Sequence, residues 1–257
     1  PDAGRDDLQL DPQGRRRYDR RAGNRRLLLS SKAAHGRRGS AAGDVRERQG
    51  GGGSEDDITV DLFVDNQTTA VESGVDYTTR GSVSSNSLEL DDDSESVAFD
   101  ARGVSSGSTL VNGPINRTLT GGNRYTVVLM GDTTLDNRQL KTFSHQKMDV
   151  GSGQIRVRFI NTLSRLSGDE LSVTASGSAP GGQALVSGLE YADGSSYVSL
   201  SAGSNLAVTV NNETQGVIID DVSCSVSSGR SYDAIIAYTE FDSDDDQISL
   251  YCQPFSN

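Results

Sequence analysis

In SGLEYADGSSYVSLSAG (187–203), tyrosines and apolar residues recur at even spacing against a background of serine and glycine. A similar pattern stands earlier in the chain, in SGVDYTTRGSVSSNSLEL (73–90). Short runs of alternating apolar and polar residues between turn-forming residues are typical of strands with one buried face. The stretch therefore predicts β-structure, and its earlier counterpart predicts that the structure is repeated.

Alternating runs continue through most of the chain after residue 57. The clearest are ITVDLFVDN (58–66) and QIRVRFINT (154–162); in the second, Arg156, Arg158 and Ile160 are expected to face outward. Further predicted strands are SVAFDARG (96–103), YTVVLMGD (125–132), ELSVTAS (170–176), YVSLSAG (197–203), NLAVTVNN (205–212), YDAIIAYTE (232–240) and QISLYCQ (247–253). None of these runs has a convincing helical period, so the predicted fold class is an all-β sandwich.

Three segments repeat in the same order. SGVDY (73–77) matches SGLEY (187–191) at an offset of 114. The pattern Gly-x-x-Tyr recurs at 122–125 and 229–232, and QLKTFSHQ (139–146) aligns with QISLYCQP (247–254); these offsets are 107 and 108. The chain is therefore predicted to hold two copies of one domain, at 55–149 and 150–257. The repeated tyrosines are expected to place their rings in each core, with the hydroxyl at its edge.

Residues 1–54 form a basic tail of different composition. Residues 1–50 carry 13 Lys and Arg against 7 Asp and Glu, whereas the whole chain carries 24 against 36. The charge and glycine content of this tail predict disorder. A nucleic-acid-binding arm, or a misassigned start of the coding sequence, are the alternatives. The acidic remainder makes the folded part a poor nucleic-acid binder, and no stretch reaches the roughly 20 apolar residues of a membrane helix.

The first copy lacks a strand that the second copy has. QIRVRFINT (154–162) precedes ELSVTAS (170–176), but nothing comparable stands just before ITVDLFVDN (58–66). A missing strand leaves an unpaired sheet edge. RRLLLSS (25–31) can return to fill that edge, a strand from another chain can fill it, or the true strand was lost with the start of the coding sequence.

Cys224 and Cys252 are the chain's two cysteines. We expect them to form one structural disulfide, which implies an oxidising compartment; two buried free thiols are the alternative. If 217–226, 231–240 and the last strand were neighbours in one sheet, the cysteines would lie about 9–10 Å apart, too far for a bond. The disulfide therefore requires segment 217–226 to lie on the opposite sheet or to curl over the sheet edge. The matching positions in the first copy are Arg117 and Ser144.

Acidic turns offer the best candidate for a ligand site. In DSDDDQ (242–247), the carboxylates of Asp242, Asp244 and Asp246 are candidate ligands for a weak calcium site, because calcium prefers oxygen ligands supplied by loops. Solvated acidic turns, both here and in DDDSES (91–96), are the simpler interpretation. No other cofactor is expected.

Two literal catalytic motifs lack their expected surroundings. Gly103–Gly107 matches G-x-S-x-G, but no helical period follows it, and Ser105 with His145 is the sole Ser–His pair worth measuring. Ser144-x-x-Lys147 matches S-x-x-K without its companion motifs. We therefore expect no enzyme.

The run ALVSGLEYADGSSYVSLSAGSNLAVTV (184–210) resembles the domain-of-unknown-function family 4397. The matching residues are Leu189, Tyr191, Gly194, Tyr197, Leu200, Ala202 and Gly203. The resemblance is good over 154–253 and weaker over 58–146. It implies tandem immunoglobulin- or transthyretin-like sandwiches in an exported bacterial protein, but it implies no activity.

These observations favour a non-catalytic interaction module that is periplasmic, on the cell surface or extracellular. Its partner would be a protein or a surface polymer of unknown identity. The alternative is a structural subunit that assembles into a homo-oligomer by β-strand exchange through an incomplete first domain.

Overall fold

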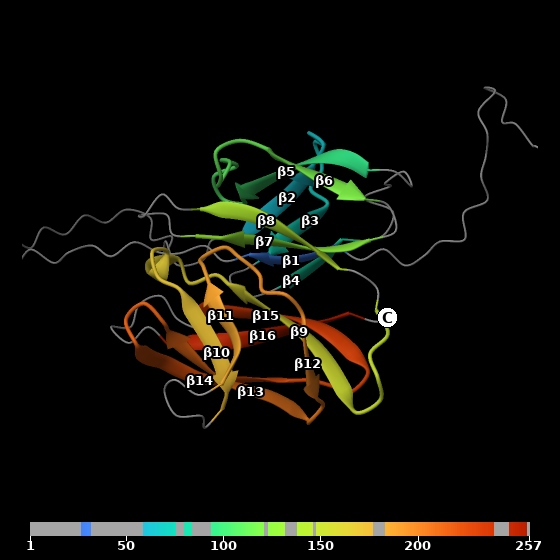
Figure 1. The fold of residues 1–257 in the computed structure, drawn as a ribbon. Helices are drawn as coiled ribbons and strands as arrows, with labels where there is room; N and C mark the ends of the chain where they lie inside the picture. The colour runs from blue at the N-terminus through green and yellow to red at the C-terminus, as the bar shows by residue number, and fades with distance from the viewer. Residues whose placement is uncertain are drawn as a thin grey trace, which may run out of the picture.

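The computed structural model describes the backbone of residues 27–31 and 80–83, and side chains as well in 59–75, 94–120, 123–131, 138–145, 148–176, 183–238 and 247–255. Within these ranges every element is a strand except a short 3₁₀-helix, Ser164–Leu166. The predicted all-β fold class, with tandem sandwiches, is confirmed (Figure 1). The expected domain limits at 54/55 and 149/150 stay predictions.

The strands fall into two sets of equal size. The first set is β1 (Leu27–Ser31), β2 (Val60–Val64), β3 (Glu72–Val75), β4 (Arg80–Val83), β5 (Ser94–Gly103), β6 (Ile115–Thr120), β7 (Arg124–Met130) and β8 (Gln139–His145). The second set is β9 (Gln154–Asn161), β10 (Leu171–Ala175), β11 (Ala184–Leu189), β12 (Val198–Ser201), β13 (Asn205–Asn212), β14 (Val217–Ser225), β15 (Arg230–Tyr238) and β16 (Ile248–Phe255).

Each set builds one sandwich of two sheets with the same strand order. The first sandwich has sheets β4-β1-β7-β8 and β3-β2-β5-β6; the second has β12-β9-β15-β16 and β11-β10-β13-β14. The pairing directions repeat as well: β1 runs parallel to β7 and β9 runs parallel to β15, whereas the other pairs are antiparallel. The repeat seen in the sequence is therefore a strand-for-strand repeat.

Strand β1 corrects two expectations. Leu27–Ser31 was assigned to a disordered tail, but it pairs with β4 from Leu27↔Val83 to Ser30↔Arg80 and with β7 from Leu27↔Tyr125 to Ser31↔Leu129. It occupies the position that β9 has in the second sandwich. The edge expected to be unpaired is filled by Leu27–Ser31 of the same chain, which was one of the three alternatives, so the first sandwich has a counterpart for each strand of the second.

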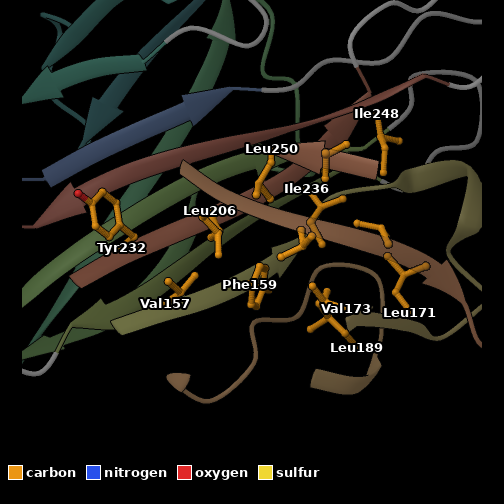
Figure 2. Close-up of a cluster of buried hydrophobic side chains, with 14 of the residues drawn as sticks. Val157, Phe159, Leu171, Val173, Leu189, Leu206, Tyr232, Ile236, Ile248 and Leu250 are labelled. Carbon is orange, nitrogen blue, oxygen red and sulfur yellow. The ribbon is translucent and has the colours of Figure 1, made fainter. Parts of the chain in front are cut away.

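Apolar side chains on alternate strand positions fill each sandwich. The first core is built around Val60, Leu62, Val64, Val97, Phe99, Leu119, Val127, Leu129 and Leu140. The second is built around Ile155, Val157, Phe159, Leu171, Val173, Val208, Val210, Tyr232, Ile236, Ile248 and Leu250 (Figure 2). The predicted inward faces of 58–66 and 154–162 are therefore correct for the residues described.

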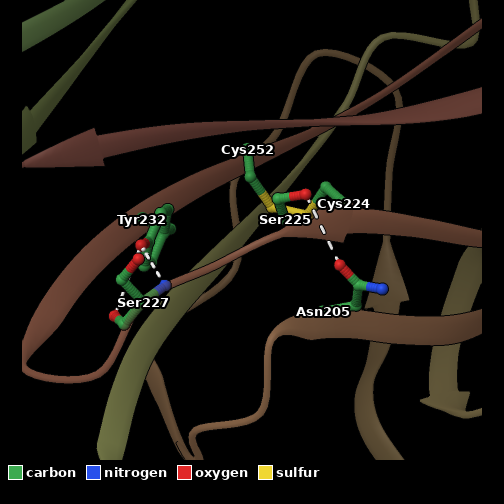
Figure 3. Close-up of a disulfide and its surroundings, with 6 residues drawn as sticks. All are labelled: Asn205, Cys224, Ser225, Ser227, Tyr232 and Cys252. Atoms are coloured by element: carbon green, nitrogen blue, oxygen red, sulfur yellow. Dashed lines mark hydrogen bonds between the residues drawn. A yellow bond between two sulfur atoms is a disulfide. The ribbon is translucent and has the colours of Figure 1, made fainter.

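Each core has a tyrosine corner at its edge, in which a tyrosine hydroxyl is hydrogen-bonded to the backbone a few residues earlier. The hydroxyl of Tyr125 accepts a hydrogen bond from the Thr120 backbone N–H at 2.6 Å, and that of Tyr232 accepts one from Ser227 N–H at 2.7 Å (Figure 3). Both bonds span five residues, at matching places in the two sandwiches. This corner is typical of immunoglobulin-like sandwiches. The predicted ring-in, hydroxyl-at-edge arrangement is confirmed for these two tyrosines.

The predicted disulfide is present. Cys224 lies on β14 and Cys252 on β16, in opposite sheets, with their Cα atoms 5.8 Å apart (Figure 3). This is the first of the two placements that the spacing argument allowed.

The strand register revises one of the matching positions. Cys252 stands opposite Ala234, and the residue opposite the equivalent Val127 is Thr142, so Thr142 and not Ser144 corresponds to Cys252. The expected alignment of the last strands was two residues out, a shift that keeps the same face inward. Arg117 does correspond to Cys224. Arg117 pairs with Val97 of β5, Cys224 pairs with Leu206 of β13, and Val97 and Leu206 stand at equivalent positions of these two strands.

Candidate functional site between the two sandwiches

The two inner sheets, β4-β1-β7-β8 and β12-β9-β15-β16, pack against each other (Figure 1). Their contact, which we call the junction, is an apolar cluster separate from the two sandwich cores. It comprises Val128, Met130, Ile160, Ala192, Ile235 and Ala237, with Phe143, Tyr191 and Tyr251 packed against it. When β7 and β15 are aligned on their corner tyrosines, Val128 matches Ile235 and Met130 matches Ala237. The junction thus resembles an isologous dimer interface.

The sequence of the inner strands explains why they are covered on both faces. In β7, Val127 and Leu129 point into the sandwich core, whereas Val128 and Met130 point into the junction. β15 divides in the same way along AIIAY (234–238). Strands buried on both faces have continuous apolar runs in place of alternating ones.

An ion pair lies buried at this junction. Asp233 of β15 is completely buried, and Arg158 of β9 donates to both of its carboxylate oxygens: Nε to Oδ1 at 2.9 Å and Nη2 to Oδ2 at 2.9 Å. The third guanidinium nitrogen, Nη1, donates to the backbone carbonyl of Ser144 at 2.9 Å. Arg158 therefore joins the carboxylate of its own sandwich to the backbone of the other one.

His145, at the end of β8, reaches from the first sandwich into the same cluster. Its Nε2 lies 2.8 Å from Thr126 Oγ1 and 3.1 Å from Asp233 Oδ2, and its Nδ1 lies 2.6 Å from the Tyr197 hydroxyl. The ring of Phe255 covers it, with the ring centroids 3.5 Å apart. A neutral imidazole fits these contacts when Nε2–H donates to the carboxylate and Nδ1 accepts from the tyrosine.

Tyr197 and Gly194 come from the loop that precedes β12. The Tyr197 ring lies under two guanidinium groups, 4.8 Å from Arg156 and 5.0 Å from Arg158. A Cβ atom on Gly194 would come within 3.0 Å of the Phe143 ring, so glycine allows the loop to approach the first sandwich this closely. This loop therefore places both residues against the first sandwich.

Two sequence expectations need correction here. Tyr191 and Tyr197 were expected in a sandwich core; both are only partly buried, and they contact the junction. Arg158 and Ile160 were expected to face outward on β9, but both are buried. The physical reason is the same in both cases: the first sandwich covers the outer face of this sheet.

Burial and charge set the protonation of the cluster. Desolvation is the largest influence on His145 and lowers its pKa, although Asp233 acts in the opposite direction. Burial alone would raise the pKa of Asp233, but the hydrogen bond from His145 and the charge and hydrogen bonds of Arg158 outweigh it and keep that pKa low. Desolvation also raises the pKa of Tyr197. The cluster is therefore an ionised Asp–Arg pair bound to a neutral histidine and a neutral tyrosine.

The candidate calcium ligands Asp242, Asp244 and Asp246 lie outside the described residues. Within the described ranges no group of three or more metal-binding side chains is found. The same ranges contain no helix with the length and hydrophobicity needed to cross a membrane.

The structure does not join the candidate Ser–His pair. Ser105 is exposed in a turn after β5, whereas both ring nitrogens of His145 are occupied by Thr126, Asp233 and Tyr197. Ser144 contributes its backbone carbonyl to Arg158, and Lys147 lies outside the described residues.

The junction residues were missed at the sequence level, although a signal existed. The unbroken apolar runs in YTVVLMGD (125–132) and YDAIIAYTE (232–240) indicate strands that are covered on both faces.

The comparisons with known proteins identify no family. No protein-family model matches this chain, and no curated protein does. Among solved structures, it is similar at 11% identity to family 41 carbohydrate-binding modules of streptococcal virulence factors, with 88% of this chain and 96% of that chain covered and a TM-score of 0.24. A family 26 module from Eubacterium rectale Amy13K, solved with maltoheptaose, gives 14% identity, 89% and 97% coverage, and a TM-score of 0.25. Likeness at these TM-scores supports no inference about this chain's ligand.

Proposed function

We propose that this chain is a non-catalytic interaction module of an exported protein. The observation that carries the proposal is the use of its reactive side chains. His145, Asp233, Arg158 and Tyr197 bind one another between the sandwiches, and both cysteines form the disulfide. Side chains engaged in this way link parts of the molecule to one another and are not available to act on a substrate.

An oxidising compartment is the setting that this chemistry fits best. The Cys224–Cys252 bond links the two sheets of the second sandwich, and disulfides of this structural kind persist in exported proteins. The acidic net charge of −12 agrees with a soluble protein that repels anionic polymers. The resemblance to family 4397 supports the same location.

Binding would use the turns and edge strands that the sandwiches expose. Val104 follows β5, and Val217 and Ile218 begin the edge strand β14; these three side chains are exposed by 45–49%. Loops and edges held on a rigid scaffold are the usual places for recognition. The partner would be a protein or a surface polymer.

The experiment is a binding survey with the oxidised, full-length chain. The protein is immobilised and incubated with envelope proteins, cell-wall fragments and exopolysaccharides of its source cells, and interferometry measures their binding. We expect saturable binding to one fraction, weakened by Val217→Ser/Ile218→Ser or by Val104→Ser. Chromogenic esters and glycosides are tested in parallel, and turnover of either that His145→Gln abolishes would refute the proposal.

A matched variant separates binding from folding. Ser223, also on β14, is exposed, and Ser223→Ala should bind like the wild type. Absence of saturable binding to every fraction, with the wild type folded and disulfide-bonded, would also contradict the proposal.

A further inference from the structure

We propose that His145 makes the junction a pH-sensitive latch, so that acidification separates the two sandwiches while each keeps its own fold. This inference does not depend on what the module binds. It concerns how far the two sandwiches remain one rigid body when the surroundings become acidic.

The geometry places His145 between strands of both sandwiches. On its own sandwich it faces Thr126 and is paired in register with Arg124 of β7. From the second sandwich it faces Asp233 of β15, Arg158 of β9 and Tyr197 before β12, whereas β16 contributes the uncharged ring of Phe255. A change in the charge of His145 therefore acts on the contact between the sandwiches.

The charges around His145 already compensate each other when its imidazole is neutral. Arg158 already compensates the charge of Asp233 through two hydrogen bonds. A proton added to His145 would create a second cation with Nε2 only 3.4 Å from Arg158 Nη2. The protonated Nδ1 would have to donate to the Tyr197 hydroxyl, whose own proton would then be donated to Asp233 Oδ1 at 3.2 Å. Asp233 favours the imidazolium, but burial works against it more strongly, so the pKa of His145 is lowered.

The direction of the pH effect on the junction follows from the pKa of His145 in its open and closed forms. Once the junction opens, His145 is hydrated and regains the ordinary histidine pKa of about 6.5. Above that pH both forms are neutral and the junction is unaffected. Below it the open form binds a proton that the closed form does not, so the open-to-closed ratio rises by up to about tenfold per pH unit. The increase stops at the lowered pKa of the closed form.

The junction opens before either sandwich because His145 belongs to neither sandwich core. The two cores are formed by other residues, and His145 reaches water once the inner sheets part. The second sandwich also keeps its Cys224–Cys252 bond.

Hydrogen–deuterium exchange on the full chain tests this, at about pH 7.5 and about pH 5.5 with intrinsic rates corrected. We expect the protection of the 190–197 loop, which packs against the first sandwich in the closed junction, to fall by up to about tenfold at the lower pH. Protection of β9 should stay, because its backbone bonds to β12 and β15 lie within its own sandwich. Protection of β10 and β13, in the outer sheet of the second sandwich, should not change. His145→Gln should remove the pH response.

The chain supplies a matched control, because its other histidine is His35. His35→Gln should keep the pH response of the wild type. Should His145→Gln fail to fold, the two histidine Cε1–H resonances of the wild type give a second readout, in which one titrates below the ordinary histidine pKa. The proposal is overturned if the wild type shows no pH response, if His145→Gln retains it, or if β10 and β13 lose protection together with the junction.

Discussion

At the scale of single residues, the Asp233–Arg158 pair shows how a carboxylate can be buried and still remain ionised. Arg158 makes two hydrogen bonds to the carboxylate, and His145 and Tyr197 lie against the same oxygens. Such a pair is not strong evidence of net stabilisation, since desolvation opposes its attraction. Removing one partner is a different matter, because the other then remains buried and uncompensated.

Asp233→Asn should therefore destabilise the protein by about 3–5 kcal/mol, since it strands the guanidinium of Arg158. Urea unfolding measures the change. Asp100→Asn is the comparison, because Asp100 is also buried but its partner Arg102 has a side chain that is 35% exposed. Water can hydrate the guanidinium left behind, so this variant should lose less stability than Asp233→Asn. Equal losses in the two variants would contradict this assignment.

The corner tyrosines carry the second prediction at this scale. Tyr125→Phe and Tyr232→Phe each leave one backbone N–H without its acceptor, at Thr120 and Ser227. Each should lower the free energy of unfolding by about 1–3 kcal/mol. Tyr251→Phe is the control, since its hydroxyl makes no hydrogen bond within the described ranges. A loss in Tyr251→Phe as large as in the corner variants would argue against the role of the hydroxyl bonds.

At the scale of strands, each sandwich links the edge strands of its two sheets, and the two sandwiches do so by different means. In the second, the Cys224–Cys252 bond connects β14 to β16. In the first, Arg117 of β6 donates from Nη2 to the backbone carbonyl of Leu140 on β8 at 2.8 Å. The first sandwich thus has a hydrogen bond at the place where the second has its disulfide, and Thr142 stands at the position of Cys252.

Replacing both cysteines with serine should cost about 3–4 kcal/mol, the value expected for closing a loop of this size. The reduced wild type should behave like the double variant, and exchange should rise in β14 and β16 but not in β6 and β8. Alkylation of two thiols in untreated wild-type protein, detected by mass spectrometry, would show that the bond does not form.

Strand β1 gives the prediction that concerns assembly. It lies between β4 and β7, so deletion of 1–31 would leave both strands with unpaired backbone groups. We expect this truncation to associate with itself, as light scattering after size-exclusion chromatography would show. Deletion of 1–24, which keeps β1, is the matched control and should elute like the full chain. Identical elution of the two truncations would show that β1 is not needed to protect the edge.

The sequence predicts some of these strands better than others, for a physical reason. β2 and β13 alternate because one face meets a core, and each was predicted from that pattern. β9 was predicted from the same alternation, although the junction buries Arg158 and Ile160 on its other face. The edge strands β3 and β6, with sequences ESGV and INRTLT, have too few apolar residues to give a period. β1 was recognised only as one of several alternatives, because three leucines in a basic segment do not reveal which sheet they join.

At the scale of the whole molecule, the junction is what the sequence predicts least. Its residues come from β7, β8, β9, β15 and β16 and from the 190–197 loop, so no local motif contains them. The disulfide was predictable because it joins two residues of one kind. A buried polar cluster depends instead on how two finished surfaces meet, and Asp233 and His145 have ordinary surroundings in the sequence.

Because the sandwiches share the junction, they should unfold together at about neutral pH. Met130 and Ile235 are buried there on opposite sides, and a shared apolar core couples the stabilities of its parts. Calorimetry of the wild type should give one transition whose calorimetric and van't Hoff enthalpies agree. Met130→Asp buries a charge between the sheets and should split this into two transitions. Val208→Ala, in the second core alone, should lower a single melting temperature through the cavity it leaves. Two transitions in the wild type would mean that the junction does not couple the sandwiches.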